Sequence, residues 1–238
     1  MDKFLAGRNA VITGGSRGIG LAIAEALVTC GAGVAICGRS QETVDHAVRH
    51  LTNLSKSKVV GKVADVREST EVSSFFEFVD SRLGNFDILV NNAGIGIFKS
   101  TADLSVEDWR ATLETNLSGV FYCCREALQR LKSRKAGYII NISSLAGKNA
   151  FAGGAAYNAS KFGLNGFSEA MMLDHRYDNV RVSYIMPGSV DTDFSSRSEH
   201  SSWKIAPADI GGLVLMLLQL PERTLVSRIE VRPSKPMK

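Results

Sequence analysis

Short apolar runs alternate with longer amphipathic segments along almost the whole chain. Several of the short runs are apolar at consecutive positions, as in strands that are buried on both faces. These runs predict strands over residues 9–14, 33–38, 58–63, 86–92, 137–143, 180–186 and 227–233. Between them, the spacing of apolar positions predicts helices over residues 18–30, 41–54, 69–83, 106–133, 156–177 and 207–219.

This regular alternation of strands and helices predicts the fold class. Consecutive strand–helix–strand units build a parallel sheet, because each helix carries the chain back to the start of the next strand. The chain shows no internal repeat and no linker rich in proline or glycine. We therefore expect an α/β fold, one doubly wound domain over residues 1–238 with a seven-stranded parallel sheet and helices on both faces.

The segment 189–206 interrupts the alternation. It is rich in serine, follows the sixth predicted strand, and contains Phe194 and Trp203. Doubly wound folds bind ligands at the carboxyl ends of their strands, so this segment is a candidate substrate lid. A mobile surface loop is the alternative, and the sequence leaves both open.

Composition places the chain among ordinary globular proteins. It has 238 residues, 45% of them hydrophobic and 22% charged. No signal peptide and no stretch long enough to span a membrane is apparent, so we expect a cytoplasmic protein without a membrane partner. The net charge of +4 raises the question of nucleic acid, but the basic residues are scattered, and we predict no nucleic-acid partner.

Cysteine and histidine spacing does not indicate a metal site. The four cysteines, at 30, 37, 123 and 124, form no C-x-x-C pair and lie in apolar surroundings typical of buried, reduced thiols. His46 and His50 are four residues apart, but no third ligand lies nearby in the sequence. We predict no metal.

A glycine-rich turn, "TGGSRGIG", joins the first predicted strand to the first helix. Gly14, Gly18 and Gly20 are spaced G-x-x-x-G-x-G. Glycines allow a tight turn and let the backbone approach a pyrophosphate at the start of a helix. The turn therefore predicts a dinucleotide site.

Two arginines indicate which dinucleotide is bound. NAD-binding proteins usually carry an acidic residue about twenty positions after the turn, where it holds the ribose 2′-hydroxyl. Here the second strand ends in Gly38 and Arg39 instead. Arg39 can form charge-assisted hydrogen bonds with a 2′-phosphate, and Arg17 in the turn can approach the same group. The cofactor expected is NADP(H).

The stretch "YNASK" places a phenol and an ammonium four residues apart. In a helix, Tyr157 and Lys161 lie on the same face. A nearby positive charge favours the phenolate, so we expect Lys161 to lower the pKa of Tyr157. The pair indicates a proton donor, although the motif alone is also compatible with an ordinary surface pair.

Seven motifs in order carry a family resemblance over essentially the whole chain. They are "TGGSRGIG", "DV" (65–66), "NNAG" (91–94), "TNLSG" around Asn116, "ISS" (142–144), "YNASK" and "PGSVDT" (187–192). With these motifs the chain resembles the short-chain dehydrogenase/reductase superfamily. The resemblance implies a Rossmann fold and an NADP-dependent oxidoreductase that acts on CH–OH or C=O groups.

The resemblance also implies the roles of individual residues. Tyr157 would act as general acid in carbonyl reduction, Lys161 would tune it and bind the nicotinamide ribose, and Ser144 would hydrogen-bond the substrate oxygen, with Ser143 as the weaker candidate. Asn116 would bend its helix and hold a water that relays protons. The catalytic set is Asn116, Ser144, Tyr157 and Lys161.

Cofactor contacts follow in the same way. Asp65 would bind the adenine amino group with the Val66 backbone beside it, and Thr192 would contact the nicotinamide carboxamide. The full set expected at the cofactor is Gly14, Ser16, Arg17, Gly18, Ile19, Gly20, Arg39, Asp65, Val66, Asn92, Ala93, Gly94, Tyr157, Lys161, Pro187, Gly188, Val190 and Thr192.

The substrate pocket is expected to be apolar. Its candidates are Ala146, Phe151, Ser189, Phe194 and Trp203, which suit a hydrophobic ketone, aldehyde or acyl chain. We predict a general ketone or aldehyde reductase. The alternative is a 3-oxoacyl reductase acting on acyl-carrier-protein or acyl-CoA substrates, although the "DGG" ending usual in those reductases is absent here. A non-catalytic NADPH-binding sensor is disfavoured, because all four catalytic residues are present.

The resemblance further implies an oligomer. The predicted helices 106–133 and 156–177 are apolar on more than one face, and family members pair such helices across a two-fold axis. We expect a homodimer or homotetramer. Cys123 and Cys124 lie on the first helix and fit either that interface or the core.

Overall fold

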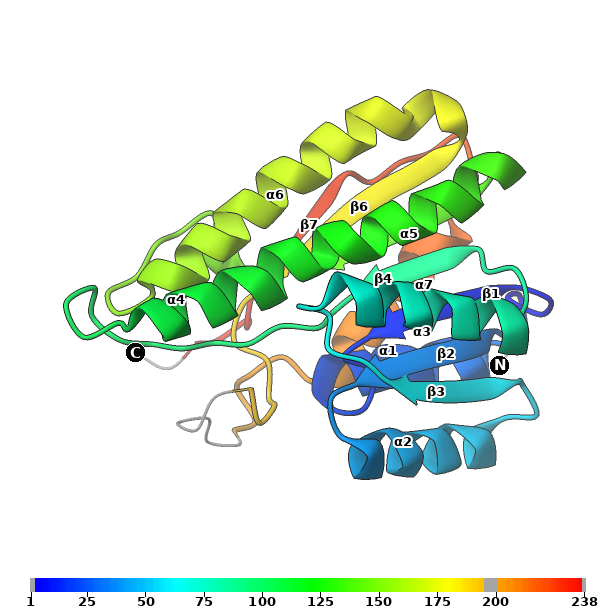
Figure 1. Ribbon diagram of the computed structural model, residues 1–238, viewed down its shortest axis with the longest axis horizontal. Helices are drawn as coiled ribbons and strands as arrows, with labels where there is room; N and C mark the ends of the chain where they lie inside the picture. Colours follow the sequence, from blue (N-terminus) through cyan, green and yellow to red (C-terminus); the bar gives the residue numbers. More distant parts are fainter. Residues whose placement is uncertain (1–2, 195–200, 237–238) are drawn as a thin grey trace.

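The computed structural model describes residues 3–194 and 201–236. Within these residues, one sheet contains seven parallel strands in the order β3-β2-β1-β4-β5-β6-β7 (Figure 1). The strands are β1 (Asn9–Thr13), β2 (Gly33–Gly38), β3 (Val59–Val63), β4 (Ile88–Asn91), β5 (Gly137–Ile142), β6 (Val180–Pro187) and β7 (Arg228–Val231). The predicted doubly wound Rossmann fold is confirmed. The extent of a single domain over residues 1–238 stays a prediction.

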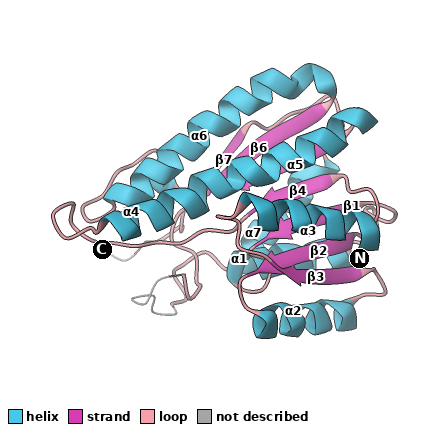
Figure 2. Cartoon of the chain, viewed as in Figure 1, coloured by secondary structure: helices cyan, strands magenta, loops and turns pink. Residues whose placement is uncertain are grey.

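Helices cover both faces of the sheet (Figure 2). They are α1 (Gly18–Thr29), α2 (Gln41–Leu54), α3 (Ser69–Arg82), α4 (Val106–Leu113), α5 (Gly119–Arg134), α6 (Ala155–His175) and α7 (Pro207–Gln219). One apolar core lies between the sheet and α1, α2 and α7, and a second between the sheet and α3, α5 and α6. The central strands β1 and β4 are buried on both sides, which explains why they are continuously apolar.

The predicted helix over 106–133 is wrong in one respect, because the structure breaks it. A π-helical turn, Glu114–Ser118, separates α4 from α5. The Gly119 amide bonds to the Glu114 carbonyl, five residues back, and the extra residue turns the Asn116 side chain into the protein. Such π turns often occur at functional sites, and no apolar spacing signals them.

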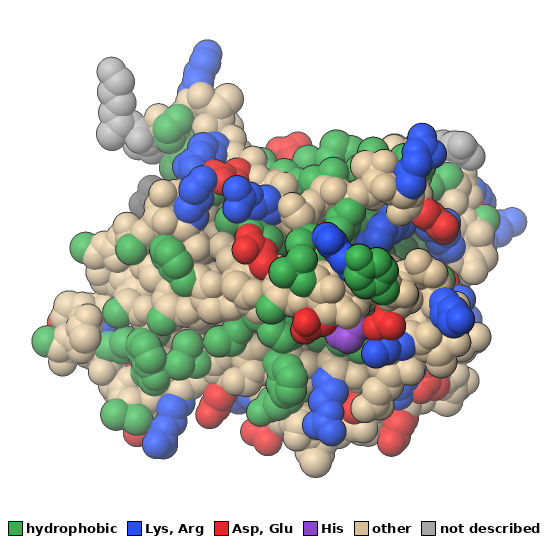
Figure 3. All heavy atoms as spheres, turned by 90° about the horizontal axis from the view of Figure 1, so that it is seen from above, with side chains coloured by type: hydrophobic (Ala, Val, Ile, Leu, Met, Phe, Trp, Pro, Cys, Tyr) green, Lys and Arg blue, Asp and Glu red, His purple; other side chains and the backbone are tan. Residues whose placement is uncertain are grey.

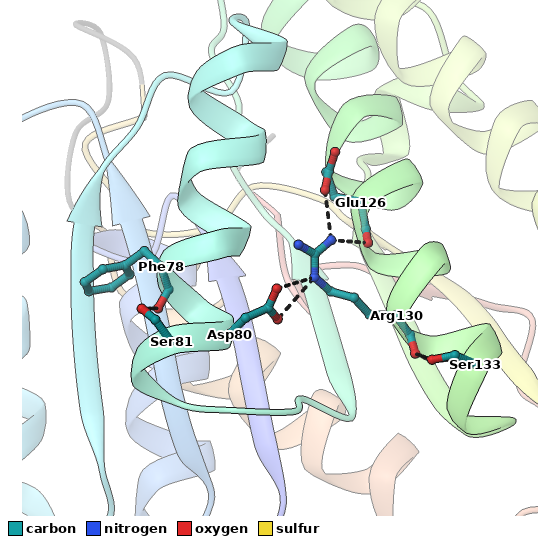
Figure 4. A network of polar contacts seen from close by, with 6 residues as sticks. All are labelled: Phe78, Asp80, Ser81, Glu126, Arg130 and Ser133. Carbon is teal, nitrogen blue, oxygen red and sulfur yellow. Dashed lines mark hydrogen bonds and ion pairs between the residues drawn. The ribbon is translucent and has the colours of Figure 1, made fainter.

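An ion-pair network fastens α3 to α5 (Figure 4). The Arg130 guanidinium lies 2.9 Å from an Asp80 carboxylate oxygen and 2.8 Å from Glu126. Burial disfavours the charge, but the hydrogen bonds that Arg130 donates to both carboxylates outweigh it and raise the pKa of Arg130 above its usual value. Arg130 also lies over the Phe76 ring, 5.4 Å from its centre, so it seals the edge of the second core.

The segment 189–206 is only partly described. Its two ends are held together, since the Asp191 amide bonds to the Ile205 carbonyl at 2.9 Å and the Ile205 amide to the Ser189 carbonyl at 3.0 Å. The middle of the predicted lid, 195–200, lies outside the described residues. No helix that the structure describes is long and apolar enough to cross a membrane.

Candidate active site

The carboxyl ends of the first six strands open into one cleft of about 1140 Å³. Loops that follow β1 to β6 all contribute to its walls, because parallel strands end at the same edge of the sheet. All but two of the predicted site residues line this cleft. The exceptions are Gly20 and Asn116, which lie behind the walls.

The glycine-rich turn is packed against the loop after β4. Gly14 has a φ of +62°, and a Cβ there would lie 2.9 Å from the Ala93 Cα. A Cβ at Gly20 would collide with the Gly14 carbonyl oxygen. The Asn92 side chain fastens the two loops by donating to the carbonyls of Thr13, at 3.2 Å, and Gly14, at 3.0 Å. Gly20 therefore packs directly against the backbone of Gly14 and does not itself line the cleft.

The start of α1 fits a pyrophosphate. Its N-cap residue, Arg17, makes no side-chain capping hydrogen bond, and its first turn contains no acidic residue. The amides at a helix start carry partial positive charge and bind anions. Gly18 faces Thr192 across the cleft, since a Cβ at Gly18 would lie 3.4 Å from the Thr192 methyl. The loop after β6 thus reaches the glycine turn, and the predicted contact of Thr192 with the nicotinamide carboxamide stays a prediction.

Polar groups gather at the end of the cleft beside β2. Arg17 and Arg39 are exposed and line the cleft, and Ser16 packs against Gly38, the residue before Arg39. The hydroxyls of Thr43 and Ser16 are 3.4 Å apart. Thr43 and the α2 N-cap Ser40 also line the cleft. Sequence reasoning missed Ser40 and Thr43, although "RSQET" contains the signature of a helix start directly after Arg39.

The Asp65 carboxylate already has a partner. It accepts hydrogen bonds from the Arg67 guanidinium, the shortest at 2.6 Å. Burial opposes ionisation of Asp65, but the hydrogen bonds and charge of Arg67, assisted by the charge of Arg39, outweigh it and lower the pKa of Asp65 below its usual value. An ionised carboxylate has about four acceptor positions, so it can also accept from an adenine amino group.

Tyr157 and Lys161 lie one turn apart on α6, as their spacing predicts. Both side chains are buried, at 9% and 4% exposure. The Lys161 ammonium lies 5.8 Å from the centre of the Tyr157 ring and donates to the Ile142 carbonyl at 3.0 Å. The ammonium is thus enclosed between α6 and the end of β5, and none of the ion pairs among the described residues includes it.

The pKa of Tyr157 is raised overall, whereas Lys161 alone is expected to lower it. Burial raises the pKa of Tyr157 to about 12, and a hydrogen bond with Ser144 offsets this only in part. Burial also lowers the pKa of Lys161, to about 8. The i, i+4 spacing takes no account of burial, and burial is the largest cause of both pKa shifts.

Of the two candidate serines, Ser144 faces the site. Its hydroxyl accepts a hydrogen bond from the Ala146 amide at 3.1 Å and reaches Tyr157. The Ser143 hydroxyl instead donates to the Asn165 side chain at 2.5 Å. Ser143 is therefore occupied in fixing the loop, which agrees with its place as the weaker candidate.

The Asn116 side chain is fixed by two hydrogen bonds with the backbone of Ile95 and one with Ser160. Its amide oxygen accepts from the Ile95 amide at 2.8 Å, and its nitrogen donates to the Ile95 carbonyl at 2.9 Å and to Ser160 at 3.1 Å. A Cβ at Gly94 would lie 3.2 Å from the Asn116 oxygen and 3.9 Å from the Lys161 nitrogen. Asn116 thus positions the loop beside Lys161, and its predicted water relay stays a prediction.

Two asparagines that sequence reasoning missed hold α6 to the loop that carries Ser144. Asn158 donates to the Ala146 carbonyl at 2.7 Å, and Asn165 donates to the Gly147 carbonyl at 3.0 Å. They are seven residues apart, so they lie on the same face of α6 as Lys161. Asn158 lies inside "YNASK", so that motif could have indicated it, whereas nothing in the sequence singles out Asn165.

The substrate end of the cleft is aromatic. The predicted residues Ala146, Phe151, Ser189, Phe194 and Trp203 line it, together with Phe98. The segment after β7 also lines the cleft, through Arg232, Pro233 and Pro236. This segment is far from the other loops in sequence and contains no motif that indicated it. Among the described residues, no group of histidines, cysteines and acids is arranged to hold a metal ion.

Comparisons with known proteins agree with this geometry. A family model for short chain dehydrogenases matches residues 8–203. The 3-oxoacyl-(acyl-carrier-protein) reductase FabG of Chlamydia muridarum is 35% identical over 195 residues, which cover 82% of this chain and 79% of that protein.

Solved structures with nucleotide bound are also similar. A metagenomic short-chain oxidoreductase in complex with NADP is 35% identical, with a TM-score of 0.86, and the match covers 98% of this chain and 99% of that one. An alcohol dehydrogenase from the archaeon Thermococcus sibiricus, complexed with 5-hydroxy-NADP, is 30% identical, with a TM-score of 0.91, covering 97% of this chain and 99% of that one.

Replacing Lys161 with methionine should stabilise the protein at neutral pH. The folded-state pKa of about 8 lies below the usual 10.5, so between these values the unfolded chain binds more protons. The buried charge therefore lowers the free energy of unfolding by its full amount below pH 8, and this destabilisation disappears toward pH 10.5. Since 2.5 pKa units correspond to about 3 kcal/mol, and the Ile142 carbonyl loses its donor, we expect Lys161→Met to raise the free energy of unfolding by about 1–3 kcal/mol.

Urea unfolding at pH 7 and pH 10.5 measures this effect. The gain should be largest at pH 7 and should shrink at pH 10.5, while the exposed control Lys56→Met should change little at either pH. A Lys161→Met variant that is less stable than the wild type at pH 7 would show that the ammonium contributes to folding.

Proposed function

The chain belongs to the short chain dehydrogenase family, and from this premise we propose that it reduces a ketone or aldehyde to an alcohol with NADPH, with Tyr157 as the general acid. As a family member it is an oxidoreductase that acts on carbonyl or hydroxyl groups. The observation that supports the specific proposal is the meeting of Ser144, Tyr157 and Lys161 in the cleft, with Tyr157 and Ser144 in hydrogen-bond contact.

The proton step rests on the Tyr157 hydroxyl. NADPH, when bound, supplies a hydride to the carbonyl carbon. As the carbon–oxygen double bond becomes single, the oxygen gains negative charge, and Tyr157 transfers its proton to that oxygen. Because burial raises the pKa of Tyr157 to about 12, the phenol carries its proton at neutral pH, as a general acid must.

Ser144 and Lys161 stabilise the charges that form during this step. The Ser144 hydroxyl donates to the substrate oxygen beside Tyr157, so the oxygen receives two donors as its charge grows. The Lys161 ammonium stabilises the tyrosinate that proton transfer leaves behind. With a pKa of about 8, the ammonium remains charged at neutral pH.

NADP(H) rather than NAD(H) is supported by the end of the cleft beside β2. Arg17 and Arg39 line it and are exposed, and the hydroxyls of Ser16, Ser40 and Thr43 lie nearby. Guanidinium groups and hydroxyls together suit a 2′-phosphate. The two similar structures that carry NADP or 5-hydroxy-NADP point in the same direction.

A 3-oxoacyl-(acyl-carrier-protein) reductase is the second candidate. Its support is the Chlamydia muridarum relative, which carries that name at 35% identity. In such a reductase, an acidic carrier protein presents the substrate as a thioester. The two candidate functions therefore differ in the charge of the molecule that approaches the cleft entrance.

We also propose that the chain forms a homodimer or homotetramer through α5 and α6. Both helices expose large apolar side chains, namely Phe121 at 45%, Phe162 at 46% and Leu173 at 56%. The face of the molecule that includes α6 shows hydrophobic patches between charged ones in Figure 3. A second copy of the chain packed on these helices buries that apolar area.

Replacing Tyr157 with phenylalanine tests the general acid. The variant lacks only the hydroxyl, so kcat for ketone or aldehyde reduction should fall by about 10²–10⁴-fold, while the dissociation constant for NADPH changes less than about threefold. The loss of NADPH absorbance measures turnover. The control Tyr177→Phe alters a tyrosine that is 91% exposed and should behave as the wild type. Near-normal turnover in Tyr157→Phe would refute the proposed mechanism.

Replacing Arg39 with aspartate tests the cofactor. Loss of a charge-assisted hydrogen bond and gain of a like charge should weaken NADPH binding by about 10–100-fold. NADH lacks the 2′-phosphate and should be affected less than about threefold. Fluorescence titration with both nucleotides measures this difference, and Arg49→Asp on the exposed side of α2 is the matched control. An equal loss for both nucleotides contradicts the 2′-phosphate assignment.

Replacing Phe162 with glutamate tests the oligomer. A charge in the middle of a buried apolar interface is costly, so the variant should show a smaller mass by light scattering than the wild type. Leu54→Glu, at an exposed position that ends α2, should leave the mass unchanged. A wild type that is monomeric at micromolar concentration rules out this proposal.

A further inference from the structure

Two phenylalanine rings pack on the Tyr157 ring at the substrate end of the cleft, and a third packs on one of them. The Phe98 ring meets the Tyr157 ring edge-on at 5.5 Å between centres, and the Phe194 ring lies tilted at 5.8 Å. Phe151 extends the group, with its ring 5.7 Å from that of Phe98. We name Phe98, Phe151 and Phe194 the aromatic wall. They come from three separate loops, those after β4, β5 and β6, and converge only at the general acid.

Two side chains of the aromatic wall remain partly exposed, although they lie close to a buried tyrosine. Phe151 is 46% exposed and Phe194 is 42% exposed, yet both line the cleft beside a tyrosine that is 9% exposed. When a ligand covers apolar ring surface that faces a cleft, the removal of that surface from water favours binding. The wall therefore favours an apolar group next to the reacting carbonyl.

The chain makes room for these rings at Gly96. A Cβ at Gly96 would lie 2.6 Å from an edge carbon of Phe194 and 2.7 Å from Phe98. Any side chain there displaces one of the two rings from Tyr157. The absence of a side chain at this position is what allows two aromatic residues to pack on the general acid from different loops.

Charges around this end of the cleft largely balance among the described residues. Arg232 lines the cleft and lies 3.3 Å from Glu230, which also pairs with Lys148 at 2.7 Å, and Asp191, Asp193 and Lys204 line the cleft as well. An entrance that attracts a phosphate-bearing acyl carrier needs an excess of positive charge. The balance here favours a substrate without charge.

We propose that the aromatic wall makes this enzyme selective for uncharged carbonyl compounds that carry an aryl ring next to the carbonyl group. The inference rests on the proposed carbonyl reduction at Tyr157. The substrate oxygen must lie within hydrogen-bond reach of the Tyr157 hydroxyl, so the group attached to the carbonyl carbon lies beside the rings that pack on Tyr157. Aromatic rings at these separations prefer edge-on or offset contact with another ring, beyond the burial of area alone.

A pair of ketones of the same skeleton tests the selectivity. Acetophenone and cyclohexyl methyl ketone have the same number of heavy atoms, and only the first has an aromatic ring. We measure kcat/KM for each with NADPH. The two ketones differ in intrinsic reactivity, so the quantity of interest is the change in their ratio between wild type and variant, from which the intrinsic difference cancels.

Phe151→Leu and Phe98→Leu keep apolar volume and remove the ring. Each should lower the ratio of acetophenone to cyclohexyl methyl ketone by about 2- to 10-fold, the range for one aromatic pair. Gly96→Ala should lower the ratio as well, by displacing a ring. The control Phe78→Leu, on α3 outside the cleft (Figure 4), should leave the ratio unchanged. If the wall variants and the control give the same ratio as the wild type, the inference is wrong.

A binding measurement separates failure of the inference from failure of the proposed function. The chain has two tryptophans, Trp109 and Trp203, and only Trp203 lines the cleft. In a Trp109→Phe background, the fluorescence of Trp203 reports the binding of 1-phenylethanol and 1-cyclohexylethanol, the two alcohol products.

The two readouts give distinct outcomes. Tighter binding of 1-phenylethanol that Phe151→Leu abolishes supports the wall even if neither ketone is reduced, a result that refutes only the proposed function. Reduction of both ketones with a ratio and a binding preference that no wall variant alters overturns the inference and leaves the function intact. Faster turnover of an acetoacetyl thioester than of either ketone also overturns the inference, in favour of an acyl substrate.

Discussion

The buried ammonium of Lys161 is the constraint around which the active-site half of the fold is built. It lies between α6 and the end of β5, 4% exposed, with the Ile142 carbonyl as its hydrogen-bond acceptor. Burial of an ammonium without a carboxylate opposes folding, because the hydration it loses is not replaced. The two apolar cores on either side of the sheet must offset that cost. Stability therefore does not explain the position of Lys161, which agrees with the role proposed for it in the cleft.

The surroundings of Lys161 are held by backbone contacts and amide side chains. Gly94 leaves space in front of the ammonium, and Asn116 fixes the adjacent loop through the backbone of Ile95. On the other side, Asn158 and Asn165 tie α6 to the loop that carries Ser144. These amide groups remain neutral, so they fix the geometry without adding charges that change the protonation of Tyr157 or Lys161.

Most of the architecture and much of the cleft could be predicted from sequence, for a common reason. Continuous apolar runs indicate strands buried on both faces, and parallel strands bring the segments that follow them to one edge. Gly14, Arg39, Asp65 and Thr192 meet there although they are far apart in sequence. The apolar spacing does not reveal the π turn at Asn116, because one extra residue within a helix leaves that spacing almost unchanged; only the family resemblance pointed to a bend there.

The sequence by itself determined the fold class, the family, and the presence of a phenol and an ammonium on one helical face, since these depend on spacing and local chemistry. Only the tertiary structure decided what that pair does electrostatically. Burial raises the pKa of Tyr157 to about 12 and lowers that of Lys161 to about 8, and burial depends on every element packed around them. The meeting of Phe98, Phe151 and Phe194 was likewise decided in three dimensions, because no local pattern relates loops after three different strands.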